Sequence, residues 1–143
     1  MKLEIFPLLA ISYAVFLVLT LVGATGADGV PWYEATIVNL PLYSQDTWSV
    51  RGGDLFIVAS MGLLFIELIR ATKTGTESIT NHLLSFMLFI AVLLTFILAP
   101  GFGNSVFFIF TTMTLLDPMA GFVVTTVTAR RDIGVPDKSS LLG

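Results

Sequence analysis

The sequence predicts an all-α membrane protein, an antiparallel bundle of four transmembrane helices with a small extracytoplasmic β-hairpin between the first and second helices. Of the 143 residues, 55% are hydrophobic and 12% are charged, and the mean hydropathy is +0.92. One water-soluble core of this size cannot hide so much apolar surface. The apolar residues also gather in runs near the ~20 residues that cross a bilayer, and the one long segment between runs is rich in β-forming residues.

The first apolar run predicts a helix over about residues 5–24. It carries no charge, and Pro7 falls in its first turn, where a missing backbone N–H is tolerated. A secretory signal peptide is the alternative, because Lys2 precedes the run and Ala24-Thr25-Gly26-Ala27 resembles a cleavage site. The run exceeds the roughly 7 to 15 apolar residues of such signals, so we expect a retained transmembrane helix.

Three more transmembrane helices are predicted, over about residues 54–72, 82–99 and 105–129. Asp54 is placed to cap the first of them. Pro100-Gly101 ends the second, because proline removes a backbone donor and glycine frees the chain. Asn104-Ser105 then precedes the last apolar run. Short connections between these helices favour antiparallel neighbours.

These helices and the outer loop, residues 26–53, are expected to form a single membrane domain over residues 1–131, followed by a flexible cytoplasmic tail, residues 132–143. Short cytoplasmic loops retain Lys and Arg. Of the seven basic residues, only Arg51 falls on the far side of a four-span topology. We therefore expect a bacterial inner-membrane protein with both termini in the cytoplasm, on the side of Lys2, Arg70, Lys73, Arg130, Arg131 and Lys138.

The outer loop predicts a β-hairpin with strands over residues 35–42 and 47–51 around a polar turn. A short amphipathic helix over residues 31–39 is the alternative. Two strands alone are marginally stable in water, so the hairpin must rest on the bilayer, on the helix ends or on a partner. Amphipathic aromatic residues collect at the headgroup level. An outer-loop interaction surface is therefore expected from Trp32, Tyr33, Tyr43 and Trp48.

Asp117 is the residue that lipid solubility explains least, because a charged carboxylate at that depth costs at least roughly 2.5 kcal/mol. Every other predicted helix carries a hydroxyl group at a similar depth. The expected intramembrane polar site therefore consists of Asp117, Tyr13, Ser60, Thr95 and Thr114.

Two roles for this polar site remain open from the sequence. It could fix the register of the helices, with Gly121 one turn from Asp117 admitting a neighbouring backbone. It could instead hold a proton or a cation, since Pro118 removes the backbone donor that would bind the carbonyl of Thr114.

Other polar residues predict no catalytic, cofactor-binding or metal site. Glu67 and Arg70 lie three apart on one helical face and are expected to form an ion pair at the interface. His82 is the only histidine and cysteine is absent, so a metal site lacks ligands and His82 is expected to be a first-turn residue at the interface. The phenylalanines are expected to serve packing and lipid contact. The net charge of -3 provides no footprint for nucleic acid.

Three stretches of the chain carry a family resemblance: GGDLFIVASMGLLFIELIRATKTG, NHLLSFMLFIAVLL and VFFIFTTMTLLDPMAGFVVTTVTARRD. Their most specific features are Gly53-Asp54, Glu67 followed by Arg70, and Asp117 with Gly121. Over residues 48–134 the chain resembles a family of small, functionally uncharacterised four-helix inner-membrane proteins of alphaproteobacteria. Pro118 departs from that pattern. The resemblance implies a location and an architecture, and no activity.

The sequence thus favours a non-enzymatic structural or accessory protein of the inner membrane. It would contact membrane lipids and associate with another membrane protein or with copies of itself. The alternative is a small oligomeric proton or cation transporter with Asp117 as the coupling acid.

Overall fold

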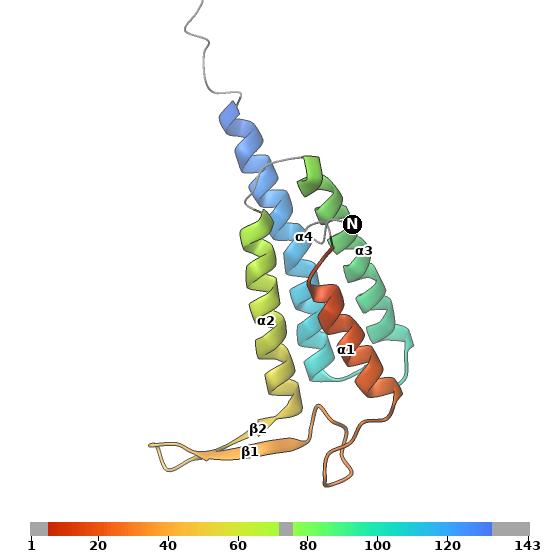
Figure 1. Ribbon diagram of the computed structural model, residues 1–143, viewed down its shortest axis with the longest axis vertical. Helices are drawn as coiled ribbons and strands as arrows, with labels where there is room; N and C mark the ends of the chain where they lie inside the picture. Colours follow the sequence, from red (N-terminus) through yellow and green to blue (C-terminus); the bar gives the residue numbers. More distant parts are fainter. Residues whose placement is uncertain (1–5, 72–75, 133–143) are drawn as a thin grey trace, which may run out of the picture.

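The computed structural model describes residues 6–71 and 76–132, with backbone alone for residues 76–79, 124, 125 and 128–132. The helices of this part of the chain lie side by side in alternating directions, and a hairpin projects crosswise from one end (Figure 1). The prediction of a mostly helical chain with a two-stranded hairpin is confirmed. In chain order the elements are α1 (Leu9–Leu21), β1 (Thr36–Pro41), β2 (Thr47–Arg51), α2 (Gly52–Ala71), α3 (Thr76–Leu98) and α4 (Ser105–Asp132).

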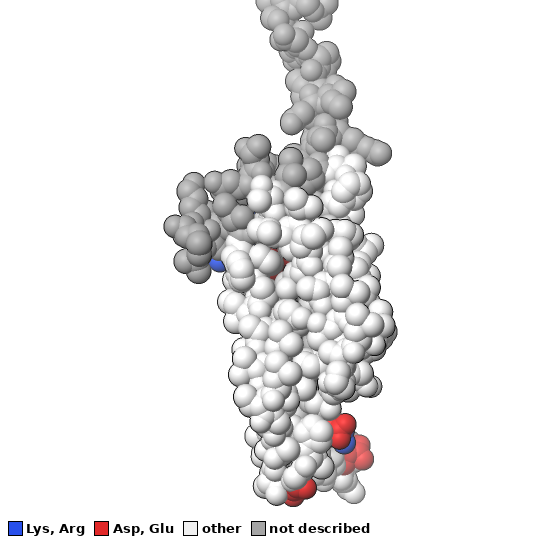
Figure 2. All heavy atoms as spheres, turned by 90° about the vertical axis from the view of Figure 1, so that its right-hand side faces the viewer, with Lys and Arg blue, Asp and Glu red and all other residues white. Residues whose placement is uncertain are grey.

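Three helices are long and apolar enough to cross a membrane: α2 over Gly52–Ala71, α3 over Thr80–Leu98 and α4 over Ser105–Val123. The space-filling view shows one long side of the molecule almost without charged side chains, with acidic groups gathered at the hairpin end (Figure 2). The prediction of three long apolar helices is therefore confirmed, although α3 begins at Thr76, six residues before the predicted start.

Helix α1 is shorter than predicted. It spans 13 residues, Leu9–Leu21, where the sequence predicted a helix over about residues 5–24. At about 1.5 Å per residue it is roughly 20 Å long, less than the ~30 Å of a hydrocarbon core. Pro7 precedes the first turn, and Gly23, with φ of 65°, occupies the left-handed conformation that commonly ends a helix.

At the other end of the chain, α4 continues to Asp132, three residues beyond the prediction. The rest of the predicted cytoplasmic tail lies outside the described residues. Ile5, where the first predicted helix starts, also lies outside the described residues. The same holds for three of the basic residues that predicted the orientation, Lys2, Lys73 and Lys138.

The hairpin forms within the two predicted strand segments, and the alternative helix over residues 31–39 is wrong. Gln45, with φ of 72°, closes the turn, where the backbone N–H of Leu42 donates to the carbonyl of Asp46 over 2.8 Å. At its base the hairpin leads directly into α2. Gly52 is required there, because a side chain would collide with the backbone of Trp32.

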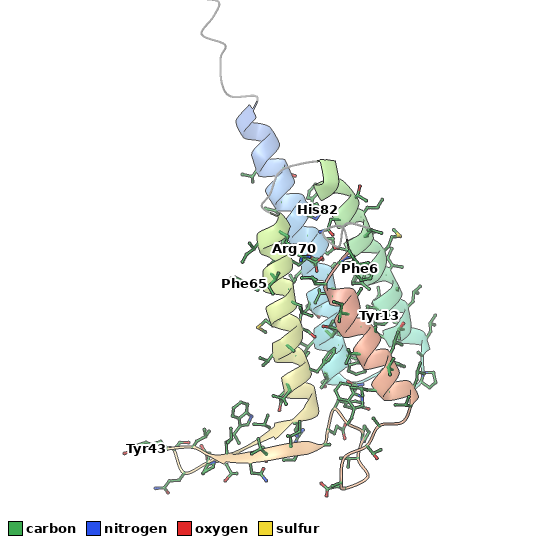
Figure 3. All side chains as sticks on the ribbon, in the orientation of Figure 1. Phe6, Tyr13, Tyr43, Phe65, Arg70 and His82 are labelled. Atoms are coloured by element: carbon green, nitrogen blue, oxygen red, sulfur yellow. The ribbon has the colours of Figure 1, made fainter. Side chains whose placement is uncertain are left out.

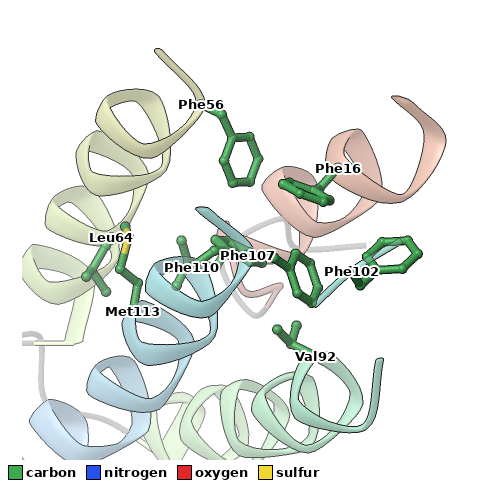
Figure 4. Close-up of a cluster of buried hydrophobic side chains, with 9 residues drawn as sticks. Phe16, Phe56, Leu64, Val92, Phe102, Phe107, Phe110 and Met113 are labelled. Carbon is green, nitrogen blue, oxygen red and sulfur yellow. The ribbon is translucent and has the colours of Figure 1, made fainter. Parts of the chain in front are cut away.

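The core at the hairpin end is aromatic. Phe16 of α1 is fully buried, and its ring centroid lies 4.7 Å from that of Phe107, 4.9 Å from Trp32 and 5.1 Å from Phe56. Phe102, in the connection before α4, packs against the same ring from another side (Figure 4). We call these five rings the aromatic cluster. It joins α1, α2, α4 and the segment that leads into the hairpin.

Candidate functional site

Buried polar side chains gather at the opposite end of the helices, beside the start of α1. With the half-buried His82 of α3 they form what we call the polar cluster: Glu67 of α2, Asn81, His82 and Ser85 of α3, and Asp117 of α4. Glu67 and Ser85 are each 1% exposed, Asp117 is 2% exposed and Asn81 8% exposed. Burial of such groups is costly unless they are hydrogen-bonded or neutralised, so each needs a physical reason to be there.

Glu67 caps the short helix α1. Its Oε2 atom accepts the backbone N–H of Leu8 over 3.0 Å and that of Leu9 over 3.4 Å. The first backbone N–H groups of any helix have no partner inside the helix, and the carboxyl oxygen of Glu67 supplies the missing acceptor. Because α1 begins inside the helical body, the cap comes from a residue 58 positions away along the chain.

The seam between α3 and α4 brings the remaining members of the polar cluster together. The imidazole of His82 lies against Gly121, where a Cβ atom would collide with the ring. One turn along, Ser85 is placed to interact with the carboxyl of Asp117, and His82 lies within electrostatic range of that carboxyl. Gly121 therefore admits a neighbouring side chain, whereas the sequence predicted that it would admit a backbone.

Two acids meet in the polar cluster, because Glu67 and Asp117 interact electrostatically across the contact between α2 and α4. Three buried oxygen atoms nearby make no protein hydrogen bond among the described residues: Asn81 Oδ1, Ser85 Oγ and Asp117 Oδ2. Ser85 and Asp117 are thus neighbours without reaching hydrogen-bonding geometry. Within the same part of the chain no three His, Asp or Glu side chains converge in a way that could hold a metal ion.

The predicted polar site around Asp117 is divided into separate contacts. Tyr13 shares a hydrogen bond of 2.6 Å with Thr95, which joins α1 to α3. The hydroxyl of Ser60 donates to Ser12 over 2.8 Å, and this contact joins α2 to α1. Thr114 donates to the carbonyl of Thr111 within its own helix over 2.7 Å. None of these hydroxyl groups joins Asp117, which instead faces Glu67, His82 and Ser85.

The expected ion pair between Glu67 and Arg70 is also wrong. Glu67 turns inward to the start of α1, while Arg70 stays half-exposed and acts on Glu67 only through longer-range electrostatics. His82 is half-buried near the start of the apolar part of α3, and its ring lies against Gly121 of α4 (Figure 3). Glu67 turns inward because the first backbone N–H groups of the short α1 have no acceptor inside their own helix.

A sequence signal for Glu67 did exist. The buried residues of α2 recur at helical spacing, as Gly53, Phe56, Ser60, Leu64, Glu67 and Ala71. Since Ser60 was already expected to face inward, the helical period places Glu67 on the same stripe. The i, i+4 spacing of Asn81 and Ser85 is the corresponding signal in α3.

The predicted outer-loop surface is divided between the helical body and the hairpin. Trp32 belongs to the aromatic cluster, and its indole N–H donates to Thr20 over 3.3 Å. Tyr33 stacks on Phe16 with ring centroids 5.9 Å apart, and burial, with the nearby charge of Glu34, raises the pKa of its hydroxyl. The other two aromatic residues, Tyr43 and Trp48, lie on the hairpin and are exposed.

Comparison of the chain with family models, with curated proteins and with solved structures finds no significant match. The candidate site must therefore be interpreted from its own residues.

Proposed function

We propose that the protein is an integral, multi-pass component of a bacterial inner membrane, with both termini in the cytoplasm. Its role is structural or accessory, through association with a partner complex or with copies of itself. In this proposal α2, α3 and α4 cross the bilayer, and the N-terminal segment with the shorter apolar helix α1 makes the fourth crossing that brings both termini to the cytoplasm. The proposal is supported by three helices of sufficient length and hydropathy, and by the charge-poor side of the molecule.

One observation carries the association role: the hairpin extends past α2 with its outer strand edges open. Within the described part of the chain, β1 and β2 pair only with each other, so each has an unpaired edge of backbone N–H and C=O groups. Such edges are templates for another chain. Tyr43 at the tip is fully exposed and stands well away from the helices (Figure 3). A hairpin presented in this way suits contact with a neighbouring protein.

The polar cluster supports the proposed structural role, because its contacts hold the helices together. Glu67 binds the start of α1, and His82 fills the space that Gly121 leaves. In lipid, packing at small residues and hydrogen bonds between helices drive helix association, because burial of apolar surface no longer does. Contacts of this kind hold a defined body that can present the hairpin at a fixed angle.

The test is photo-crosslinking in native membranes. A photoreactive amino acid at position 43 should give a discrete adduct with one neighbour. The matched control is the same group at Ile97, a 63% exposed position on the last turn of α3, where diffuse lipid adducts are expected. The intact particle in mild detergent should also exceed the 15.5 kDa of one chain. A monomeric mass together with no adduct from position 43 would refute the association role.

A second function, proton or cation transport, is favoured by one specific observation. Glu67 and Asp117 are both buried and interact electrostatically, and two interacting carboxyl groups at low dielectric favour a state in which a proton or a cation offsets one of the charges. Asp117 would be the coupling acid. The supporting ligands would be the oxygen atoms of Asn81 and Ser85 that accept no hydrogen bond from the residues described by the structure, in place of the hydroxyl groups that the sequence predicted.

Liposome flux measurements separate the two functions. If the chain transports protons or cations, the wild type should conduct and Asp117→Asn should lose conduction while remaining folded. The control is Asp46→Asn, which removes an exposed carboxylate of the hairpin turn and should conduct normally. Absence of flux in the wild type, or equal flux in Asp117→Asn, would remove transport and leave the accessory role.

A further inference from the structure

We infer that one face of the β1–β2 hairpin lies flat on the phospholipid surface on the side from which the hairpin projects. The inference rests on the proposed membrane crossing of α2, α3 and α4, and it adds a specific contact with the bilayer. It concerns a face of the hairpin, and it leaves the strand edges and the tip free for a neighbouring protein.

Strand register separates the hairpin into an apolar face and a polar face. Directly opposed residues of an antiparallel pair point to the same side. Val38 is opposed to Val50 and Leu40 to Trp48, so these four side chains form the apolar face.

The polar face is formed by the paired residues between them, and Ile37, in the irregular part of the register near the base, is assigned to neither face. Asn39 is opposed to Ser49 and Pro41 to Thr47, and the Ser49 hydroxyl donates to Asn39 Oδ1 over 2.7 Å. Arg51 follows Ser49 at a spacing of two and therefore shares the polar face. The apolar face thus carries no charged residue within the strands.

The exposure of the side chains on the apolar face changes along the hairpin and indicates the direction in which this face points. Val50, at the base where β2 runs into α2, is 6% exposed, whereas Trp48, Leu40 and Val38 further out are 50%, 41% and 44% exposed. The face is therefore covered where the hairpin meets the helices and open where it extends beyond them. Because the helical body covers this face at Val50, the open part of the face turns to the same side as the helices, where lipid would lie in the proposed membrane arrangement.

The outward side of α2 continues this apolar surface. Val58 and Phe65 are 67% and 64% exposed, and Phe65 points away from the helical body on the side over which the hairpin extends (Figure 3). The hairpin meets α2 at a corner (Figure 1), and exposed apolar side chains line both of its sides. A bilayer fits both surfaces at once, with acyl chains against α2 and the headgroup boundary against Trp48 and Leu40, since tryptophan favours that boundary. It also supplies the apolar support that two strands need.

Fluorescence quenching tests this directly, because the chain holds only two tryptophans. Trp32→Phe leaves Trp48 as the sole emitter in phosphatidylcholine vesicles whose acyl chains are brominated near the headgroup or near the bilayer centre. Quenching of Trp48 by the shallow bromines should exceed quenching by the deep ones by roughly twofold or more, since interfacial side chains lie within about 5–10 Å of the acyl boundary. Aqueous iodide should quench it weakly. The matched control, Trp48→Phe, retains Trp32 inside the aromatic cluster.

Two outcomes would overturn the inference. Strong iodide quenching without bromolipid quenching would place Trp48 in water. If neither iodide nor bromolipid quenches Trp48, a partner protein or a second copy of the chain covers this side chain. A reporter at position 65, in a chain with Trp32→Phe and Trp48→Phe, tests the premise separately: deep bromines should quench Phe65→Trp. If they do not, the membrane crossing itself has failed, whatever Trp48 shows.

A pair of hairpin variants provides an independent measurement. Leu40→Asp places a charge on the apolar face and should shift the emission of Trp48 to longer wavelength and at least roughly halve its shallow quenching, since a carboxylate favours water over the interface. Asn39→Asp places the same charge on the polar face and should leave both readings unchanged. Equal behaviour of the two variants would contradict the inference.

Discussion

The two ends of the helical body are held together by different physics. At the hairpin end, the aromatic cluster joins the helices through many weak contacts between large rings, with Phe16 at its centre. At the other end, the polar cluster joins them through a few directional contacts, above all the capping of α1 by Glu67. The first end depends on shape and contact area, and the second on single atoms being in the right place.

This difference determines how each end should respond to substitution. Loss of a ring removes many dispersion contacts and leaves a cavity. Loss of a polar partner leaves a buried group unsatisfied, so a conservative replacement that restores the hydrogen bond should rescue the fold. Rescue by an isosteric polar residue is therefore the signature of the polar end, and it has no counterpart at the aromatic end.

The largest effect is expected at the aromatic end. Phe16→Ala should lower the free energy of unfolding by about 3 to 5 kcal/mol, the usual range for a fully buried phenylalanine. The measurement is SDS titration in mixed micelles, followed by far-UV circular dichroism. Phe108→Ala, at a 55% exposed ring of α4, is the control and should change little. Similar losses for both rings would contradict the central position of Phe16.

The cap on α1 should show the next largest effect. Glu67→Leu leaves the N–H groups of Leu8 and Leu9 without their acceptor, and should cost roughly 2 to 3 kcal/mol at the usual penalty for unsatisfied buried donors. Glu67→Gln keeps an acceptor oxygen and should recover most of that loss in the same titration. If Gln proves as destabilising as Leu, the charge of Glu67 matters more than its hydrogen bonds, and the capping account fails.

The contact of His82 with Gly121 should give a smaller effect. Gly121→Ala forces the imidazole to move, and we expect a loss of about 1.5 kcal/mol, within the range for overpacking. Gly62→Ala is the matched control, because nothing lies within 4 Å of the added Cβ atom; it should leave stability unchanged or slightly raise it. Thermal unfolding in detergent compares the two, and equal midpoints would show that the seam between α3 and α4 is looser than the structure indicates.

The smallest effect is expected for the hydrogen bond between Tyr13 and Thr95. A double-mutant cycle with Tyr13→Phe and Thr95→Val should yield a coupling energy of about 0.6 kcal/mol, the average for such bonds inside membrane proteins. A coupling of several kcal/mol would mean that this contact, and not the polar cluster, is the main polar link between helices.

The helices and the hairpin could be predicted because their signals are local. Long apolar runs define α2, α3 and α4, and β-forming residues around a polar turn define the two strands. The apolar run of α1 was visible as well, but its true length was not. Where a helix begins inside a protein depends on what receives its free N–H groups, and here the acceptor is Glu67, which belongs to another helix.

The polar residues show the same division. The sequence marked Asp117 as a residue that needs compensation, because its place in an apolar run is enough to show the cost. It did not show which residues compensate. Ser60 is hydrogen-bonded to Ser12, and Tyr13 to Thr95. Asp117 instead interacts with Glu67, His82 and Ser85. Equal depth along separate helices leaves their rotation about the long axis open, and that rotation decides which side chains touch.

By itself, the sequence determined the apolar character and the number of the helices and the position of the hairpin, since composition and periodicity act over short stretches of chain. Only the tertiary structure decided that α1 is short, that Glu67 turns inward to cap it, and that the hairpin keeps an apolar face open beyond the helices. These features depend on contacts between residues that are distant along the chain, and those contacts exist only once the helices have packed.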